Sequence, residues 1–207
     1  MNRIFITIIA IVAIVAIFTS CQKSSEDKIK VLVSDRMNKT LYHPDTYEGV
    51  ETEVDSAFTP FDAPEFYEKT LKMAKLGAEI SQYDEETKDA KSSMSIWSGP
   101  YQTAFGRNEY NEAKEKYDNA VAAKESATKK VQALADELKK ELDKEPVFIG
   151  LKARHKYRAN NNAGQTVFGE TKFLFNKDLT EVVAEYDMDG EEYAAVQQLY
   201  KMMQGEE

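Results

Sequence analysis

Hydrophobic and polar residues recur with different periods in different parts of the chain. From Lys28 to Tyr42, apolar residues return every three or four positions, which predicts an amphipathic helix, and Pro44 is expected to end it. From Val50 to Phe58, apolar or small residues alternate with acidic ones, which is the period of a strand with one buried face. Residues 29–60 are therefore predicted to form a helix followed by a strand.

A longer helical pattern fills residues 61–145. Apolar positions alternate at spacings of three and four in two successive segments, Leu76–Trp97 and Tyr110–Leu138. Two such seams joined by a loop predict an antiparallel coiled-coil hairpin that is inserted into another domain. Asp62 is expected to cap the first helix. Lys124 interrupts the second seam, and the length of the pattern predicts projecting arms on the order of 50 Å long.

Residues 146–204 return to the period of strands and end in a helical pattern. Val182, Ala184 and Tyr186 of the last strand are expected to face inward. Together with residues 29–60, this segment predicts a single α+β domain, in which an antiparallel four-stranded sheet is packed with N- and C-terminal helices. The three later strands and the closing helix are expected at Ile149–Ala159, Gln165–Phe175, Thr180–Tyr186 and Tyr193–Met203.

The first residues of the chain have the composition of an export signal. Arg3 is followed by the 15-residue apolar segment Ile4–Phe18, interrupted only by a threonine, whereas a helix that spans a bilayer needs roughly 20 apolar residues. This pattern predicts a signal peptide over residues 1–20. Cys21 follows small residues and resembles the lipobox cysteine of bacterial lipoproteins, which implies that it is acylated. The alternative is an ordinary signal peptide with a free cysteine. Residues 21–28 are polar and predict a flexible tether.

The composition excludes several kinds of chemistry. The chain has a formal net charge of −9, one cysteine and two histidines. An acidic balance argues against a nucleic-acid partner, and acylation of the only cysteine leaves no thiol for a disulfide or a metal. His43 and His155 are not spaced as zinc ligands, and His155 is expected on the apolar face of its strand rather than as a general base. We expect no metal, no cofactor and no enzymatic activity.

A stripe of basic residues on the second predicted strand is the strongest charge feature. One reading is a platform that binds an anionic glycan or lipid. The other is pairing with acidic residues across the sheet, which would also make the first strand a neighbour of the second. The stripe consists of Lys152, Arg154, Lys156 and Arg158, and its expected partners are Glu51, Glu53 and Asp55 of the first strand and Glu181 and Glu185 of the last.

Aromatic residues gather at the predicted tip of the hairpin. Exposed aromatic and arginine side chains are typical anchors of interfaces. The alternative is that Trp97 continues the helical seam while the other aromatic residues plug its open end. The candidate binding residues are Trp97, Tyr101, Phe105 and Arg107.

Two segments resemble a family of small bacterial lipoproteins and exported domains. Leu41–Glu48 reads Leu-Tyr-His-Pro-Asp-Thr-Tyr-Glu and is similar to the helix–Pro–Asp/Ser–Tyr–Glu motif of that family. The resemblance implies only a fold and an exported location. Some relatives resemble the chain in the hairpin as well, at Ser92–Met94 and Trp97–Tyr101. The matching positions of the second half are Gly150, His155, Tyr157, Arg158, Asn160, Asn162 and Gly164.

These observations favour an exported, lipid-anchored envelope lipoprotein, located at the outer membrane, that is not an enzyme. We expect it to contact another protein or envelope component through the hairpin. A binding module for an anionic glycan or lipid is the alternative, and an envelope hydrolase is the least favoured function, because Asp and Glu are too abundant for any catalytic pair to stand out. Coiled-coil seams also pair between chains, so the hairpin could form a homo-oligomer.

Overall fold

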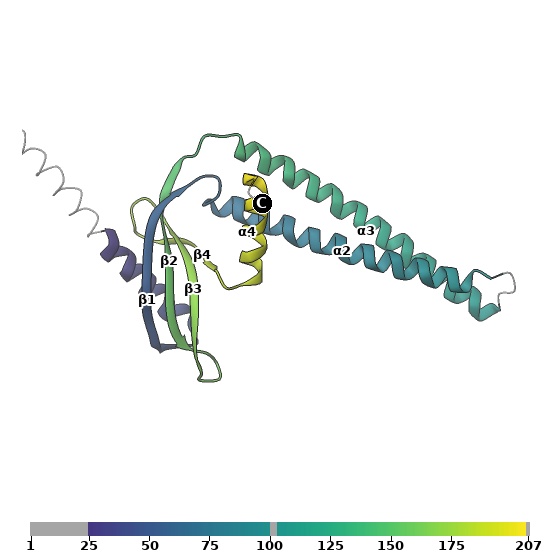
Figure 1. Ribbon diagram of the computed structural model, residues 1–207, viewed down its shortest axis with the longest axis horizontal. Coiled ribbons are helices and arrows are strands. Elements are labelled where there is room, and N and C mark those ends of the chain that lie inside the picture. Colours follow the sequence, from purple (N-terminus) through teal and green to yellow (C-terminus); the bar gives the residue numbers. More distant parts are fainter. Residues whose placement is uncertain (1–24, 100–102, 206–207) are drawn as a thin grey trace, which may run out of the picture. The chain divides into compact units, whose positions relative to one another are not determined.

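The computed structural model describes residues 25–99 and 103–205 (Figure 1). The signal peptide over residues 1–20, Cys21 and Tyr101 lie outside the described residues. The chain has the predicted α+β fold, and its described residues form four helices and one antiparallel sheet. In chain order the elements are a helix over residues 25–40, β1 (His43–Phe58), α2 (Pro64–Trp97), α3 (Ala104–Leu142), β2 (Phe148–Asn160), β3 (Thr166–Phe175), β4 (Val182–Asp187) and α4 (Glu191–Gln204).

The described chain divides into two compact units. The sheet unit comprises the N-terminal part up to Pro64 together with Pro146–Ala194, and the hairpin unit comprises Glu65–Glu145 together with the residues from Ala195 onward. The whole closing helix was expected to belong to the domain of the sheet. Instead, the aromatic ring of Tyr200 in α4 lies 5.6 Å from that of Phe66 in α2, so α4 contributes to the core of the hairpin unit.

The sheet has the strand order β1-β2-β3-β4, and every neighbouring pair is antiparallel. The prediction that the first strand neighbours the second is therefore confirmed, although α2 and α3 lie between them in the chain. The N-terminal helix packs on one face of the sheet because its apolar stripe can bury itself only there. The core of this unit consists of Ile29, Val33 and Met37 from the helix and Ala153, Phe173 and Phe175 from the strands.

Two predicted boundaries in the N-terminal segment are wrong. The helix already includes residues 25–28, which were expected to be a tether, and the acidic pair Glu26 and Asp27 stabilises a first turn through the helix dipole. The strand begins at His43 instead of Val50. Pro44 is tolerated there because β1 pairs only with β2 and so has one edge without a sheet partner among the described residues.

Bulges in β1 overturn part of the predicted alternation. The register shifts between Gly49 and Glu51 and again between Ala57 and Phe58. Each irregularity changes which side chains face the core. As a result, Val50 and Phe58 are exposed, although both were predicted to face inward, and Ala57 is buried in place of Phe58.

A further irregularity places the side chains of β4 that were predicted to face inward on two different faces of the sheet. The register shifts where Leu174 and Phe175 of β3 meet β4. Val182 lies opposite Phe175 and packs against the core, as predicted. Ala184 and Tyr186 lie opposite Leu174 and Lys172, on the face away from the N-terminal helix, so their predicted inward orientation is wrong.

The hairpin unit is built on α2 and α3, which run antiparallel to each other (Figure 1). Four residues of α3 that are seven positions apart are all buried, as a heptad seam requires. Lys124, which interrupts this seam, forms an ion pair of 2.5 Å with Asp84 of α2. Among the described residues, no helix combines the length and apolar character of a membrane-spanning segment. The four buried seam residues of α3 are Ala113, Ala120, Ala127 and Leu134.

Candidate functional site

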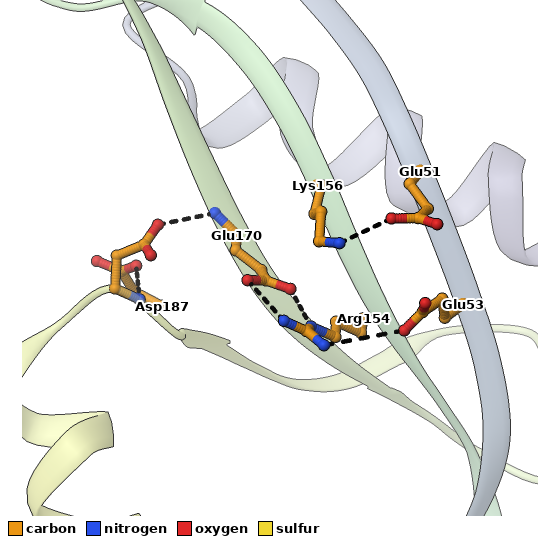
Figure 2. A network of polar contacts seen from close by, with 7 residues as sticks. Glu51, Glu53, Arg154, Lys156, Glu170 and Asp187 are labelled. Atoms are coloured by element: carbon orange, nitrogen blue, oxygen red, sulfur yellow. Dashed lines mark hydrogen bonds and ion pairs between the residues drawn. The ribbon is translucent and has the colours of Figure 1, made fainter.

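The basic side chains of β2 lie on the sheet face opposite the N-terminal helix, and each has an acidic partner. Lys156 donates to Glu51 at 2.7 Å, and Arg158 to Glu48 at 2.5 Å (Figure 2 shows the first of these pairs). These partners are the residues directly opposite in the β1 register. The interpretation of the stripe as cross-strand pairs is thus confirmed for β1.

Arg154 is held from both neighbouring strands. It lies 4.0 Å from Glu53 of β1 and donates two hydrogen bonds to the carboxylate of Glu170 in β3 (Figure 2). Glu170 is fixed in turn, because its backbone N–H donates to Asp189 at 3.0 Å. Hydrogen bonding to Arg154 lowers the pKa of the Glu170 carboxyl. The guanidinium therefore lies between two carboxylates.

The partners expected from the last strand are wrong. β3 lies between β2 and β4, so Glu181 and Glu185 cannot reach the stripe across one strand. Glu181 precedes β4. Glu185 accepts two hydrogen bonds, of 2.6 and 2.8 Å, from the guanidinium of Arg36 in the N-terminal helix. Glu170 takes the role that was expected of these two residues.

Asp62 is the buried centre of this charged face, a role that the sequence pattern does not indicate. Its carboxylate accepts hydrogen bonds from Lys152 at 2.9 Å, from Lys172 at 2.8 Å and from the backbone N–H of Phe58 at 3.1 Å. Burial alone would raise the pKa of Asp62, but the two lysines and the backbone bond together lower it. Asp62 therefore anchors the segment after β1 to the sheet and does not act as the predicted helix cap.

Exchanging the charges of one exposed pair tests the cross-strand arrangement. The single variant Lys156→Glu should lower the urea midpoint of unfolding, because it places two carboxylates opposite each other at the register position of Glu51. The double variant Glu51→Lys/Lys156→Glu should recover most of this loss. A double variant that is no more stable than the single one would contradict the pairing.

His155 is a buried structural residue, as predicted. Only 3% of it is exposed. One ring nitrogen lies 2.8 Å from the hydroxyl of Tyr47 and the other 2.9 Å from that of Thr52, while the ring stacks on Tyr157. With both nitrogens engaged, the imidazole has no site for a substrate proton. Burial lowers the pKa of His155, and a hydrogen bond to the backbone of Glu51 offsets this only in part.

The lowered pKa of His155 predicts a pH-dependent stability. Protons bind the unfolded histidine, with its ordinary pKa of 6.5, more tightly than the folded one. The free energy of unfolding should therefore be unaffected by this group well above pH 6.5 and should fall as the pH drops below 6.5. Urea denaturation of the wild type and of His155→Gln at several pH values between 7.5 and 5.5 measures how the free energy of unfolding depends on pH. An equal slope in both proteins would refute the assignment.

At the tip of the hairpin, one aromatic residue continues the helical seam and another is exposed. Trp97 is half-buried, contacts the ring of Phe105 at 5.7 Å between centroids and packs against Gly106, whose N–H donates to Thr103 at the start of α3. Trp97 thus closes the seam. Phe105 is nevertheless 62% exposed, and Arg107 is also exposed.

Ile96 is an exposed tip residue that was not among the candidates predicted from the sequence. It directly precedes Trp97 and is 71% exposed. The sequence does contain a signal for this exposure. Ile96 is next to a seam residue in the chain, and a residue at such a position points its side chain away from the partner helix. We name Ile96, Trp97 and Phe105 the apolar tip.

In the described part of the chain, no group of three histidine, cysteine or acidic side chains is arranged to hold a metal ion. Comparison of the chain with family models, with curated proteins and with solved structures finds no match.

Proposed function

We propose that this chain is an exported envelope lipoprotein that is anchored through acylated Cys21, and that it is an interaction protein whose hairpin contacts another macromolecule. The observation that carries the proposal is the apolar tip. Ile96 and Phe105 both expose large side chains. Ile96 directly precedes Trp97 in the chain, and Phe105 contacts the ring of Trp97. Clustered exposed apolar and aromatic side chains are typical of surfaces that bind a partner.

The alternative, an anion-binding sheet face, has less support. Five cationic side chains of this face are paired with six carboxylates, so an anionic glycan or lipid would have to displace a carboxylate from each cation that it bound. The cations are Lys152, Arg154, Lys156, Arg158 and Lys172, and the carboxylates are those of Glu48, Glu51, Glu53, Asp55, Asp62 and Glu170.

A matched pair of double variants tests the proposed contact. Ile96→Ser/Phe105→Ser removes the exposed tip side chains, while Val121→Ser/Phe168→Ser removes one aliphatic and one aromatic exposed side chain elsewhere. With each protein as bait in detergent-solubilised envelopes, macromolecules captured by the wild type and by the control should be lost with the tip variant. Identical capture by all three proteins would reject the tip as the contact surface. Circular dichroism of the variants checks that they fold.

The proposed anchor has its own test. Each CH₂ group of an acyl chain that is buried in the membrane contributes about 0.8 kcal/mol to binding, so loss of several chains should release the protein from the membrane. The wild type should incorporate labelled fatty acid and sediment with membranes, and Cys21→Ser should do neither. Membrane-bound, unlabelled wild type would contradict the acylation of Cys21.

A further inference from the structure

A groove with a volume of about 590 Å³ runs along the hairpin between α2 and α3. Its lining includes four alanines, of which Ala90, Ala113 and Ala120 are each at most 6% exposed and Ala123 is half-buried. Alanine has no side chain beyond Cβ, so the backbone of another segment can approach both helices closely. The lining extends from Glu109 to Ala123 on α3, which is about 20 Å of helix.

The rim of this groove is acidic. Glu86 and Asp89 of α2 and Glu109 and Glu112 of α3 line it, with Lys116 as the only lining cation among the described residues. Within residues 25–99 and 103–205, Asp89, Glu109 and Glu112 form no ion pair. An occupant with positive charge on its flanks would complement this rim.

The same charges disfavour a second copy of the chain in the groove. A symmetric dimer places the same surface patch on both partners. Two copies joined through this groove would therefore bring their carboxylate rims together, and like charges at an interface oppose association. An apolar floor also gives no advantage to a small hydrophilic cation. A helix whose small or apolar stripe is flanked by lysine or arginine fits both the floor and the rim.

We propose that the groove between α2 and α3 binds a basic amphipathic helix of a partner protein, which forms a third helix alongside the hairpin. This inference rests on the proposed function, because it names the kind of partner that the hairpin contacts. Recognition would combine close packing on the alanine floor with ion pairs along both rims.

Binding of a synthetic probe to the full-length chain in non-ionic detergent tests the charge complementarity. The probe is a fluorescent helical peptide of about four turns with an alanine–leucine stripe flanked by lysines, and the control peptide carries glutamate in place of lysine. The lysine peptide should bind and the glutamate peptide should not. Glu86→Lys/Glu112→Lys should weaken binding about tenfold or more, whereas Glu85→Lys/Glu115→Lys, which reverses one charge on each helix outside the groove, should change it less than about threefold.

A second variant tests the shape of the groove without changing its charge. Ala123 is half-buried and lines the groove, so Ala123→Leu should fill it and weaken binding of the lysine peptide about tenfold or more. Equal loss with both charge-reversal pairs and no effect of Ala123→Leu would show non-specific attraction and overturn the proposal. A dimer in sedimentation that Ala123→Leu dissociates would also overturn it, in favour of a second copy.

The outcome is separable from that of the proposed function. Ile96→Ser/Phe105→Ser leaves the groove intact and should bind the lysine peptide as the wild type does. If the peptide fails to bind while this tip variant loses the captured macromolecules, the inference about the groove is wrong and the proposed contact through the tip stands. If the peptide binds as expected and capture does not depend on the tip, the tip is not the contact surface and the groove is.

Discussion

Replacement of Asp62 with asparagine is expected to lower the free energy of unfolding by about 2–3 kcal/mol. The side chain of Asp62 is only 8% exposed and neutralises Lys152 and Lys172. Asparagine keeps the size and one carbonyl oxygen, but it leaves two lysines beside each other without their shared counter-charge. The lysine side chains are 29% and 18% exposed, so water compensates them in part and the loss should stay below that of a fully buried pair.

Asp55 provides the matched control for this prediction. It also faces Lys152, but at 3.9 Å and with 79% of its side chain exposed. Asp55→Asn should therefore change the free energy of unfolding by about 0.5 kcal/mol or less. Urea denaturation at neutral pH measures both variants. Equal effects of the two substitutions would mean that Asp62 is not the electrostatic centre of this face.

Replacement of Gly150 with alanine is expected to cost more than about 3 kcal/mol or to prevent folding. Gly150 of β2 lies opposite Ala57 of β1 and has a φ of +152°, a conformation that L residues rarely adopt. A Cβ at this position would lie 2.0 Å from the backbone oxygen of Phe175. Because that atom belongs to the neighbouring strand, the two strands would have to separate.

Gly164 separates the effect of the clash from that of the backbone conformation. It has a φ of +74°, and an added Cβ would meet no atom within 4 Å. Gly164→Ala should thus cost only about 1–2 kcal/mol. Thermal or urea unfolding of the two variants compares them directly. A Gly150→Ala protein as stable as Gly164→Ala would contradict the close approach of β2 and β3.

Pairing of the first two strands was predictable because its signal is local on both strands. Glu51, Glu53 and Asp55 repeat at the same two-residue spacing as the basic stripe, so one register satisfies all of them at once. The length of the intervening hairpin does not weaken this signal, since the cost of closing a longer loop rises slowly. The seams of α2 and α3 were predictable for a similar reason, because a heptad repeat sustained over many turns indicates a helix that packs along its length against another helix.

The role of Asp62 could not be predicted from its neighbours in the chain. An aspartate just before a proline-initiated helix fits the pattern of an N-cap. Its actual partners, Lys152 and Lys172, are 90 and 110 residues away. Tertiary contacts of this kind leave no trace in a local pattern.

The bulges and the groove were missed for related reasons. A one-residue irregularity such as that at Gly49 reverses the alternation of β1, yet the sequence contains only a glycine at that point. The groove forms only where the lining alanines and glutamates of α2 and those of α3 lie on the same side of the seam. A heptad pattern gives the contact line of two helices, but the open flank beside that line requires coordinates.

Photo-crosslinking at two exposed phenylalanines in intact cells tests the central claim, contact through the hairpin tip, most directly. Phe105 at the tip is 62% exposed, and Phe168 in the sheet unit is 75% exposed. A photoreactive phenylalanine analogue at each position gives probes of the same chemistry and similar accessibility. The account predicts a discrete adduct with another macromolecule from position 105 and none from position 168. The absence of an adduct at position 105, or the same adduct from both positions, would contradict it.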